Sequence, residues 1–268
     1  MRLLSTALIA CIACYEVASA LVSRQSARKV GLAVSRSVGS SPSQWVTAHV
    51  AAVADFGPTK TSVTNSTGLP FLPTLGQTSN VNTWLSTLVQ GYATLAIGLT
   101  EVDSGGTGVS VAVGISTWRQ AMAPLKARGY QLCSHTVTQA HSGTVWLQSF
   151  QSQCPDCWAQ VDFVCVEWFG VDAQDFINFV TSVHLTFGKD VIVTQFAVAD
   201  FNGGTTPSVG DVLALMGTTT AFMDSAAFVH TYFWLGMFLP GEGGVPSSNG
   251  LMNSDGSPNA LGLQYISS

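Results

Sequence analysis

The segments VDFVCVEW (residues 161–168) and VIVTQFA (residues 191–197) flank DAQDFINFVTSVHLTF (residues 172–187). The two flanking segments are mostly apolar and have the length of strands. The longer segment places Phe176, Phe179, Val180 and Val183 at helical spacing. A strand, a helix and a second strand in this order predict two parallel neighbours joined by a right-handed crossover.

The same alternation continues on both sides. Further strands or extended segments are expected at 30–34, 69–75, 94–100, 130–137 and 229–236, and helices opening near 42, 82, 117 and 208. Close to eight such units in about 240 residues predict an α/β fold of the small (β/α)8 TIM-barrel type in a single domain. A doubly wound open sheet is the alternative, but no Gly-x-Gly-x-x-Gly turn follows the first strand.

Composition excludes several classes of protein. Charged residues make up 9% of the 268 residues, with 10 Lys and Arg against 15 Asp and Glu. No basic surface for nucleic acid can be built from this balance. Beyond the N-terminus, no apolar run approaches the roughly 18 residues that a membrane-spanning helix needs.

The N-terminal residues 1–20 have the pattern of a secretory signal peptide. Arg2 precedes an apolar run over residues 3–13, and Ala18-Ser19-Ala20 supplies a cleavage site. A short buried helix is the alternative interpretation. Residues 21–28 then form a polar leader, and residues 29–268 form the folded domain. We therefore expect a secreted protein, extracellular or in the cell wall.

Cleavage would leave Cys133, Cys154, Cys157 and Cys165. An even number in a secreted chain favours disulfides, with three possible pairings. Cys154 and Cys157 are expected to form a short clip, although their spacing also occurs in redox motifs. No second ligand pair for zinc is evident, so we expect neither a metal nor a cofactor. Asn65 begins the only N-glycosylation sequon, in a polar stretch typical of a loop.

Carboxylates and aromatic residues gather at the expected strand ends. Glu101, Glu167 and Glu242 each lie at or after such an end. A buried carboxylate is costly unless a partner or substrate uses it, whereas a carboxylate at the rim only makes a loop more soluble. Trp168, Phe169 and Trp234 are candidates to stack on pyranose rings, with burial in the core as the alternative.

Several segments carry a family resemblance. They are GLTEVD (98–103), EWFG (167–170), VTQFA (193–197), NSDG (253–256) and ALGLQY (260–265). In this order they resemble the catalytic domains of fungal Asl1-like glycosyl hydrolases, the group that contains the endo-β-1,3-glucanases of glycoside hydrolase family 128. The corresponding family segments include Gly-Phe-Asn-Glu-Pro-Asp, His-Trp-Tyr-Gly and Val-Thr-Glu-Phe-Ala.

The resemblance implies a retaining mechanism in which Glu101 is the acid/base and the nucleophile stands at position 195. This chain has Gln195 there, and an amide cannot form the glycosyl ester. Three further positions depart from the family pattern. Thr100 replaces an Asn expected to bind the sugar, Val102 replaces a Pro, and Glu167 replaces a His.

Three functions follow as hypotheses. The first is a catalytically impaired protein that still binds β-1,3-glucan. The second is an active endo-β-glucanase in which Glu167 is the substitute carboxylate, which requires it to lie roughly 6.5–9.5 Å from Glu101 for an inverting route. The third is a structural protein of the cell wall. The sequence does not predict the oligomeric state.

Overall fold

The computed structural model describes residues 28–34, 42–106, 108–201, 204, 206–237, 239 and 244–268. The predicted signal peptide, residues 21–27 of the predicted leader and Glu242 lie outside these residues. The strands of the described part are β1 Val30–Val34, β2 Val50–Ala54, β3 Thr74–Gly76, β4 Leu95–Leu99, β5 Gln131–Leu132, β6 Phe163–Gly170, β7 Asp190–Val198 and β8 Val229–Met237.

Helices separate most of these strands, as the alternation predicts. They are α2 Ser62–Ser66, α3 Val81–Thr87, α4 Val111–Thr117, α5 Ala123–Lys126, α6 His141–Gln153, α7 Pro155–Trp158, α8 Ala173–Phe187, α9 Val209–Ser225 and α10 Ala260–Tyr265. Short 3₁₀ segments are η1 Pro42–Trp45, η2 Thr78–Asn80 and η4 Ser247–Asn249, and a π segment, η3 Trp118–Met122, joins α4 to α5. Within the described ranges, none of the helices has the length and apolar character needed to cross a membrane.

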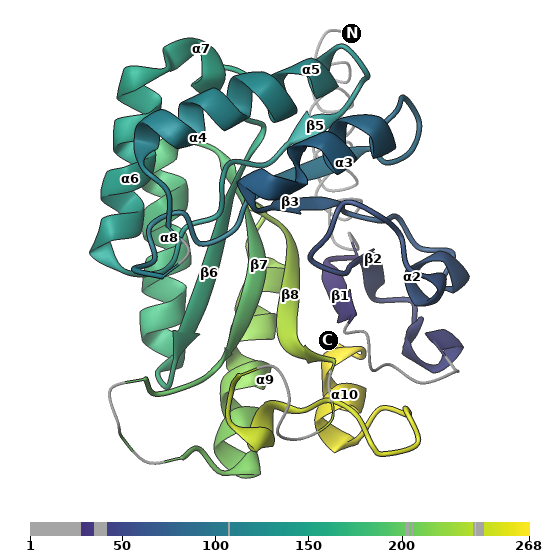
Figure 1. Cartoon of the computed structure of the whole chain (residues 1–268). Coiled ribbons are helices and arrows are strands. Elements are labelled where there is room, and N and C mark those ends of the chain that lie inside the picture. The colour runs from purple at the N-terminus through teal and green to yellow at the C-terminus, as the bar shows by residue number, and fades with distance from the viewer. Residues whose placement is uncertain are drawn as a thin grey trace, which may run out of the picture.

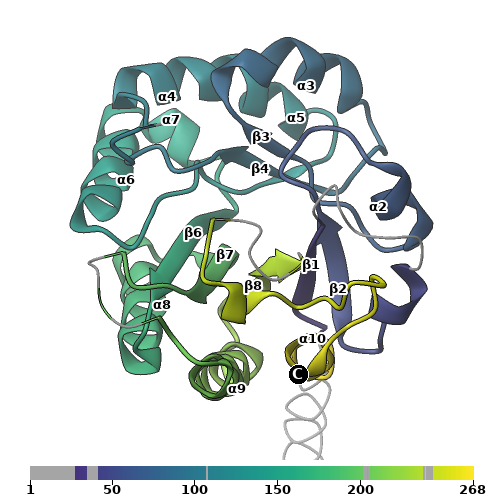
Figure 2. The ribbon, with the colours of Figure 1, turned by 60° about the horizontal axis from the view of Figure 1, so that its bottom comes forward.

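The strands pair in parallel, which confirms the predicted parallel pairing. One sheet has the order β2-β1-β8-β7-β6 and the other has the order β3-β4-β5. Isolated parallel bridges connect the two sheets, Val53 with Phe71 at one seam and Cys133 with Phe163 at the other. The strands lie toward the centre, and the helices surround them (Figures 1 and 2).

Two apolar layers pack on the two faces of the strands. An inner cluster takes small and medium side chains from both sheets: Ala33, Ala52, Ala54, Leu72, Leu95, Ile97, Cys133, Phe163, Cys165, Ile192 and Phe233. A larger outer layer fills the space between strands and helices and includes Trp118, Trp234 and Phe176. Because side chains alternate along a strand, neighbouring residues belong to different layers.

Residues 42–53 are not the predicted helix. They form the single turn η1 and then strand β2. Val46, Val50 and Val53 have helical spacing, but β2 reads VAAVA, and in so apolar a run the same valines also fit a buried strand. Pairing with β1 decides between the two conformations.

The predicted helix over 117–128 begins earlier, at Val111, where the Ser110 side chain accepts a hydrogen bond from the Val113 amide. Helices α8 and α9 start where their sequences indicate. Asp172 caps α8, and Ser208 with Asp211 forms the predicted capping box of α9.

The C-terminal helix α10 ties β1 to β8. The buried Tyr265 hydroxyl lies 2.7 Å from the Gly31 carbonyl and accepts a hydrogen bond from the Trp234 amide. The last residues of the chain therefore hold together the strands on either side of this seam.

Candidate active site

Glu101, Glu167 and Gln195 come from three strands whose carboxyl ends point the same way. Glu101 follows β4, Glu167 lies in β6 and Gln195 lies in β7. Glu167 and Gln195 are direct Cα partners across the β6–β7 pair. In parallel α/β folds, sites form at this end of the strands.

The carboxyl group of Glu167 is buried beside that of Glu101. Only 1% of Glu167 is exposed, and its carboxyl lies within hydrogen-bonding reach of that of Glu101. The Thr194 hydroxyl donates to the Val166 carbonyl and lies 3.5 Å from Oε1 of Glu167. Burial raises the pKa of Glu167 well above its usual value, and the negative charge of Glu101 raises it further. The surroundings of Glu167 therefore disfavour its ionised form.

Glu101 sits in a constrained turn. Its φ of 47° is in the left-handed region, which residues other than glycine adopt rarely and at a cost of about 1–3 kcal/mol. Asp103 anchors this turn, because its carboxylate accepts hydrogen bonds from the Thr138 amide, the Thr138 hydroxyl and the Ser142 hydroxyl. The loop from 136 to 142 thus fixes the direction in which Glu101 leaves β4.

A cavity of about 680 Å³ opens beside Glu101. Its lining is mostly uncharged, and comprises Phe56, Gly76, Gln77, Thr78, Ser79, Asn80, Leu99, Thr100, Glu101, Val102 and Val109. Thr100, a predicted substrate-binding residue, is part of this wall. Hydroxyl and amide groups beside an aromatic ring are the kind of lining that binds a neutral sugar.

Phe56 is a candidate site residue that the sequence interpretation missed. It follows β2, lines the cavity, and has a φ of 58°. Phe56 was missed because a helix was expected over residues 42–53. Sites in a parallel α/β fold are expected after strands, so no site residue was sought after this segment. The segment DFGP (residues 55–58) would have marked a strand end had β2 been recognised.

Trp168 does not face the site, which corrects the prediction of sugar stacking. Only 3% of the residue is exposed, and its ring packs edge-on against Phe176 of α8 with centroids 5.3 Å apart. Glu167 points toward Glu101, so its neighbour Trp168 must point to the outer layer.

Trp234 is likewise buried in the outer layer, in contrast to its predicted role. Its indole Nε1 donates to the Asn249 carbonyl, and its ring packs against Phe196 at 4.9 Å. The neighbouring Phe233 and Leu235 take the inner face of β8 instead.

Phe169 keeps a position suited to ligand contact. It is partly exposed at the end of β6, near Ala197 and Leu235, and its ring meets the exposed ring of Phe201 at 5.9 Å. Gln139 fixes its backbone by donating to the Phe169 carbonyl at 2.7 Å. Phe56 packs against the same small cluster, so the two rings flank the strand ends.

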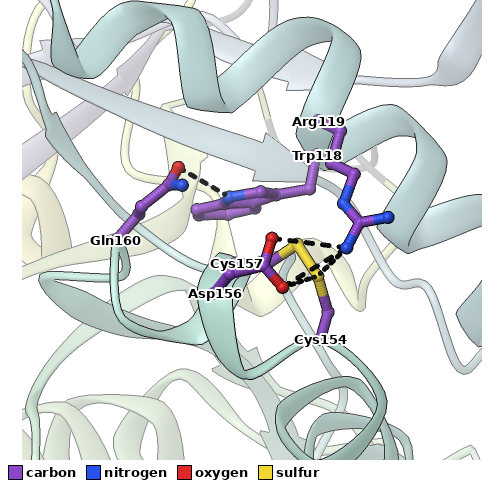
Figure 3. A network of polar contacts seen from close by, with 6 residues as sticks. All are labelled: Trp118, Arg119, Cys154, Asp156, Cys157 and Gln160. Atoms are coloured by element: carbon purple, nitrogen blue, oxygen red, sulfur yellow. Dashed lines mark hydrogen bonds and ion pairs between the residues drawn. A yellow bond between two sulfur atoms is a disulfide. The ribbon is translucent and has the colours of Figure 1, made fainter.

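The four cysteines of the predicted mature chain form two disulfides. Cys133 pairs with Cys165 in the inner cluster, and Cys154 pairs with Cys157 where α6 meets α7. Arg119 lies over the second disulfide and pairs with Asp156 at 3.3 Å (Figure 3). Asp156 and the two sulfurs lie close enough to form a metal-binding group. The sulfurs are bonded to each other, however, and offer no thiolate.

The predicted sequon residue Asn65 is exposed, but it lies in the short helix α2 rather than in a loop. Thr61 caps this helix by accepting a hydrogen bond from the Thr64 amide.

Comparison with known proteins identifies the family. A family model described as the glycosyl hydrolase catalytic core matches residues 31–265. The chain belongs to this family. Alkali-sensitive linkage protein 1 of Schizosaccharomyces pombe is 29% identical over 184 residues, which cover 68% of this chain. The chain spans about a third of that relative's length, since the match covers 34% of it.

Solved structures share the fold of this glycosyl hydrolase core. A GH128 exo-β-1,3-glucanase from Aureobasidium namibiae has a TM-score of 0.76 and 18% identity, covering 90% of this chain and 96% of its own. A GH128 endo-β-1,3-glucanase from Lentinula edodes has a TM-score of 0.76 and 21% identity, covering 88% and 98%. The endo-β-1,3-glucanase from Amycolatopsis mediterranei, in complex with laminaritriose, has a TM-score of 0.75 and 20% identity, covering 90% and 99%.

Proposed function

We propose that this chain binds β-1,3-glucan at the carboxyl ends of its strands and has lost most or all of the hydrolytic activity of its family. The observation that carries the proposal is the place of Gln195 on β7, where it is the Cα partner of Glu167, the residue whose carboxyl lies beside that of Glu101. A retaining glycosidase needs a carboxylate about 5–5.5 Å from its acid/base to form the glycosyl intermediate. Gln195 keeps the shape of that group and lacks its charge.

Glucan binding is supported by the cleft and by the relatives. The cavity wall is mostly neutral and polar, and Phe56 and Phe169 offer apolar rings on two sides. A glutamate-to-glutamine variant of the Amycolatopsis mediterranei enzyme has been crystallised with laminarihexaose. In that protein, the loss of one carboxylate is compatible with a bound glucan.

The second hypothesis, in which Glu101 and Glu167 form a working catalytic pair, fits the geometry less well. Two carboxyl groups within hydrogen-bonding reach are closer than the roughly 6.5–9.5 Å of an inverting pair, which leaves no room for the attacking water. Glu167 is also buried, which raises its pKa and disfavours the ionised form that a nucleophilic carboxylate needs.

We also propose how the domain is organised and where the protein acts. We infer that the two sheets act as one closed (β/α)8 barrel within a single domain over residues 29–268, supported by the isolated bridges at both seams. Residues 1–20 would direct the chain into the secretory pathway and be removed, which leaves residues 21–28 as a leader. Asn65 would be glycosylated on this route, and cell-wall glucan would be the ligand of the secreted protein. A purely structural role in the wall is the alternative that a binding test addresses.

The test compares the wild type with Gln195→Glu. We expect the wild type to sediment with insoluble β-1,3-glucan and to release few or no reducing sugars. Gln195→Glu should release measurably more reducing sugar than the wild type. Thr100, Val102 and Glu167, which also depart from the family pattern, limit this increase in activity. Adding Glu167→His should raise it further, because this removes the carboxyl that crowds Glu101.

Gln131→Glu is the matched control, since Gln131 is exposed at the opposite end of the strands. Gln131→Glu should leave glucan binding and the release of reducing sugars as they are in the wild type. Strong hydrolysis by the wild type that survives Gln195→Ala would contradict the proposal. Absence of glucan binding would instead favour the structural alternative.

A further inference from the structure

Glu167 is a buried carboxyl without a compensating cation. Among the residues that the structure describes, the ion pairs are Arg119 with Asp156 and Lys126 with Asp162, and neither involves Glu167. Its Oε2 is buried and finds no hydrogen-bond donor nearby. An ionised carboxylate in such a place is strongly disfavoured, whereas a carboxylic acid needs no donor for the oxygen that carries the proton.

In the part of the chain that the structure describes, the charges that act on Glu167 are negative. Glu101 and Asp103, both from the segment that follows β4, disfavour its ionised form. Strand β7 places two neutral residues beside Glu167. The Thr194 hydroxyl lies near its carboxyl, and Gln195 is its Cα partner. Two adjacent carboxyl groups cannot both ionise without a large penalty, so the pair holds one proton.

The two members of the pair have different surroundings. Glu167 is 1% exposed and lies within strand β6, whereas Glu101 is partly exposed and lines the cavity. The buried group, Glu167, is therefore the one that retains the proton. A protonated Glu167 then donates its O–H to the Glu101 carboxylate.

We propose that Glu167 is a positioning residue, whose buried carboxyl holds the Glu101 carboxylate toward the cavity, where that carboxylate accepts hydrogen bonds from glucan hydroxyls. The proposal rests on the proposed function and gives glucan binding a pH dependence. When Glu167 ionises in alkaline solution, it becomes an anion next to Glu101. The hydrogen bond is lost, the two groups repel, and Glu101 turns away from the ligand.

Glu167→Gln separates this role from simple packing. A glutamine has nearly the same volume, cannot ionise, and still offers an N–H donor to Glu101. We expect isothermal titration with laminarihexaose to show similar affinities for the wild type and Glu167→Gln at pH 5. Between pH 6 and pH 9 the wild type should weaken by about tenfold or more, whereas the variant should not.

Thermal unfolding without ligand provides an independent readout. The folded state of the wild type binds more protons than the unfolded state once the pH exceeds the ordinary value of a glutamate, so its stability should fall as the pH rises. Glu167→Gln should lack this fall. Asp175→Asn is the control, because Asp175 is exposed on α8 and its loss of charge should leave the wild-type pH profile unchanged.

Laminarihexaose affinity and thermal unfolding together distinguish failure of this inference from failure of the proposed function. Parallel pH profiles of unfolding temperature for the wild type and Glu167→Gln would overturn this inference, even if glucan binds. A binding profile for Glu167→Gln that weakens with pH as the wild type does would also overturn it. If neither protein binds laminarihexaose at any pH while the unfolding profiles differ as expected, the proposed function fails and the proton assignment stands.

Discussion

At the residue scale, the position of the Glu167 carboxyl distinguishes this cleft from the pattern of the family. Glu167 and Gln195 are partners on adjacent strands, and the family resemblance implies a carboxylate at position 195 rather than at 167. Here the carboxylate stands one strand away, buried against Glu101. The number of carboxyl groups suits a glycosidase, but their spacing does not.

Phe56 provides a residue-scale prediction. Its ring lines the cavity, and its left-handed backbone holds it there. Phe56→Leu keeps an apolar side chain but removes the flat face on which a sugar ring stacks. We expect affinity for laminarihexaose to fall about 3- to 10-fold, in line with about 0.5–1.5 kcal/mol for aromatic contacts.

Trp168→Phe is the comparison for Phe56→Leu. Trp168 is buried against α8, so this change should lower the unfolding temperature and leave the affinity of the folded protein unaltered. A loss of affinity in Trp168→Phe as large as that in Phe56→Leu would mean that the assignment of the two rings is wrong.

At the element scale, α9 is fixed to the start of β1 by a single buried lysine. The Lys29 ammonium donates to the carbonyls of Met223, Asp224 and Ala226, at 2.8, 3.1 and 2.8 Å. These carbonyls lie at the C-terminal end of α9, where they lack partners within the helix and where a positive charge is favourable. One side chain therefore connects the last long helix to the first strand.

Lys29→Met tests this connection. The thioether side chain fills a similar space but leaves the three carbonyls without a donor. We expect a loss of about 1–3 kcal/mol in the free energy of unfolding, measured by urea denaturation. Lys60→Met is the control, because Lys60 is exposed and contacts only the Tyr92 ring, and its effect should stay within about 0.5 kcal/mol.

At the scale of the whole molecule, stability depends on a histidine that must remain neutral. His135 is fully buried, its Nδ1 accepts from the Leu99 amide, and its Nε2 donates to the Gly114 carbonyl. The rings of Trp118, Trp146 and Phe150 surround it. His135 thereby joins the end of β4 to α4 and α6, and burial lowers its pKa to about 4.

The pH dependence of stability follows from this shift. The unfolded chain binds a proton at His135 near pH 6.5, whereas the folded protein binds this proton only near pH 4. Stability from this group is therefore complete above pH 6.5 and falls by about 3 kcal/mol as the pH drops to 4. NMR titration should show that the His135 ring does not titrate between pH 5 and pH 8. A His135 ring that titrates near pH 6.5 in the folded protein would contradict this account.

Local sequence by itself determined the parallel α/β topology, the caps of α8 and α9, and the family. These features depend on the apolar period within each segment and on residues next to one another in the chain. The sequence also identified Glu101, Thr100 and Gln195 as candidate site residues and left the cysteine pairing open. Only the tertiary structure decided which face of a strand each side chain takes, since a shift of one residue exchanges the two faces. That choice moved Trp168 and Trp234 to the outer layer. The pairing of β4 with β5, and of the segment after β5 with β6, brought Glu167 to Glu101 across a gap of 66 positions that no local pattern spans.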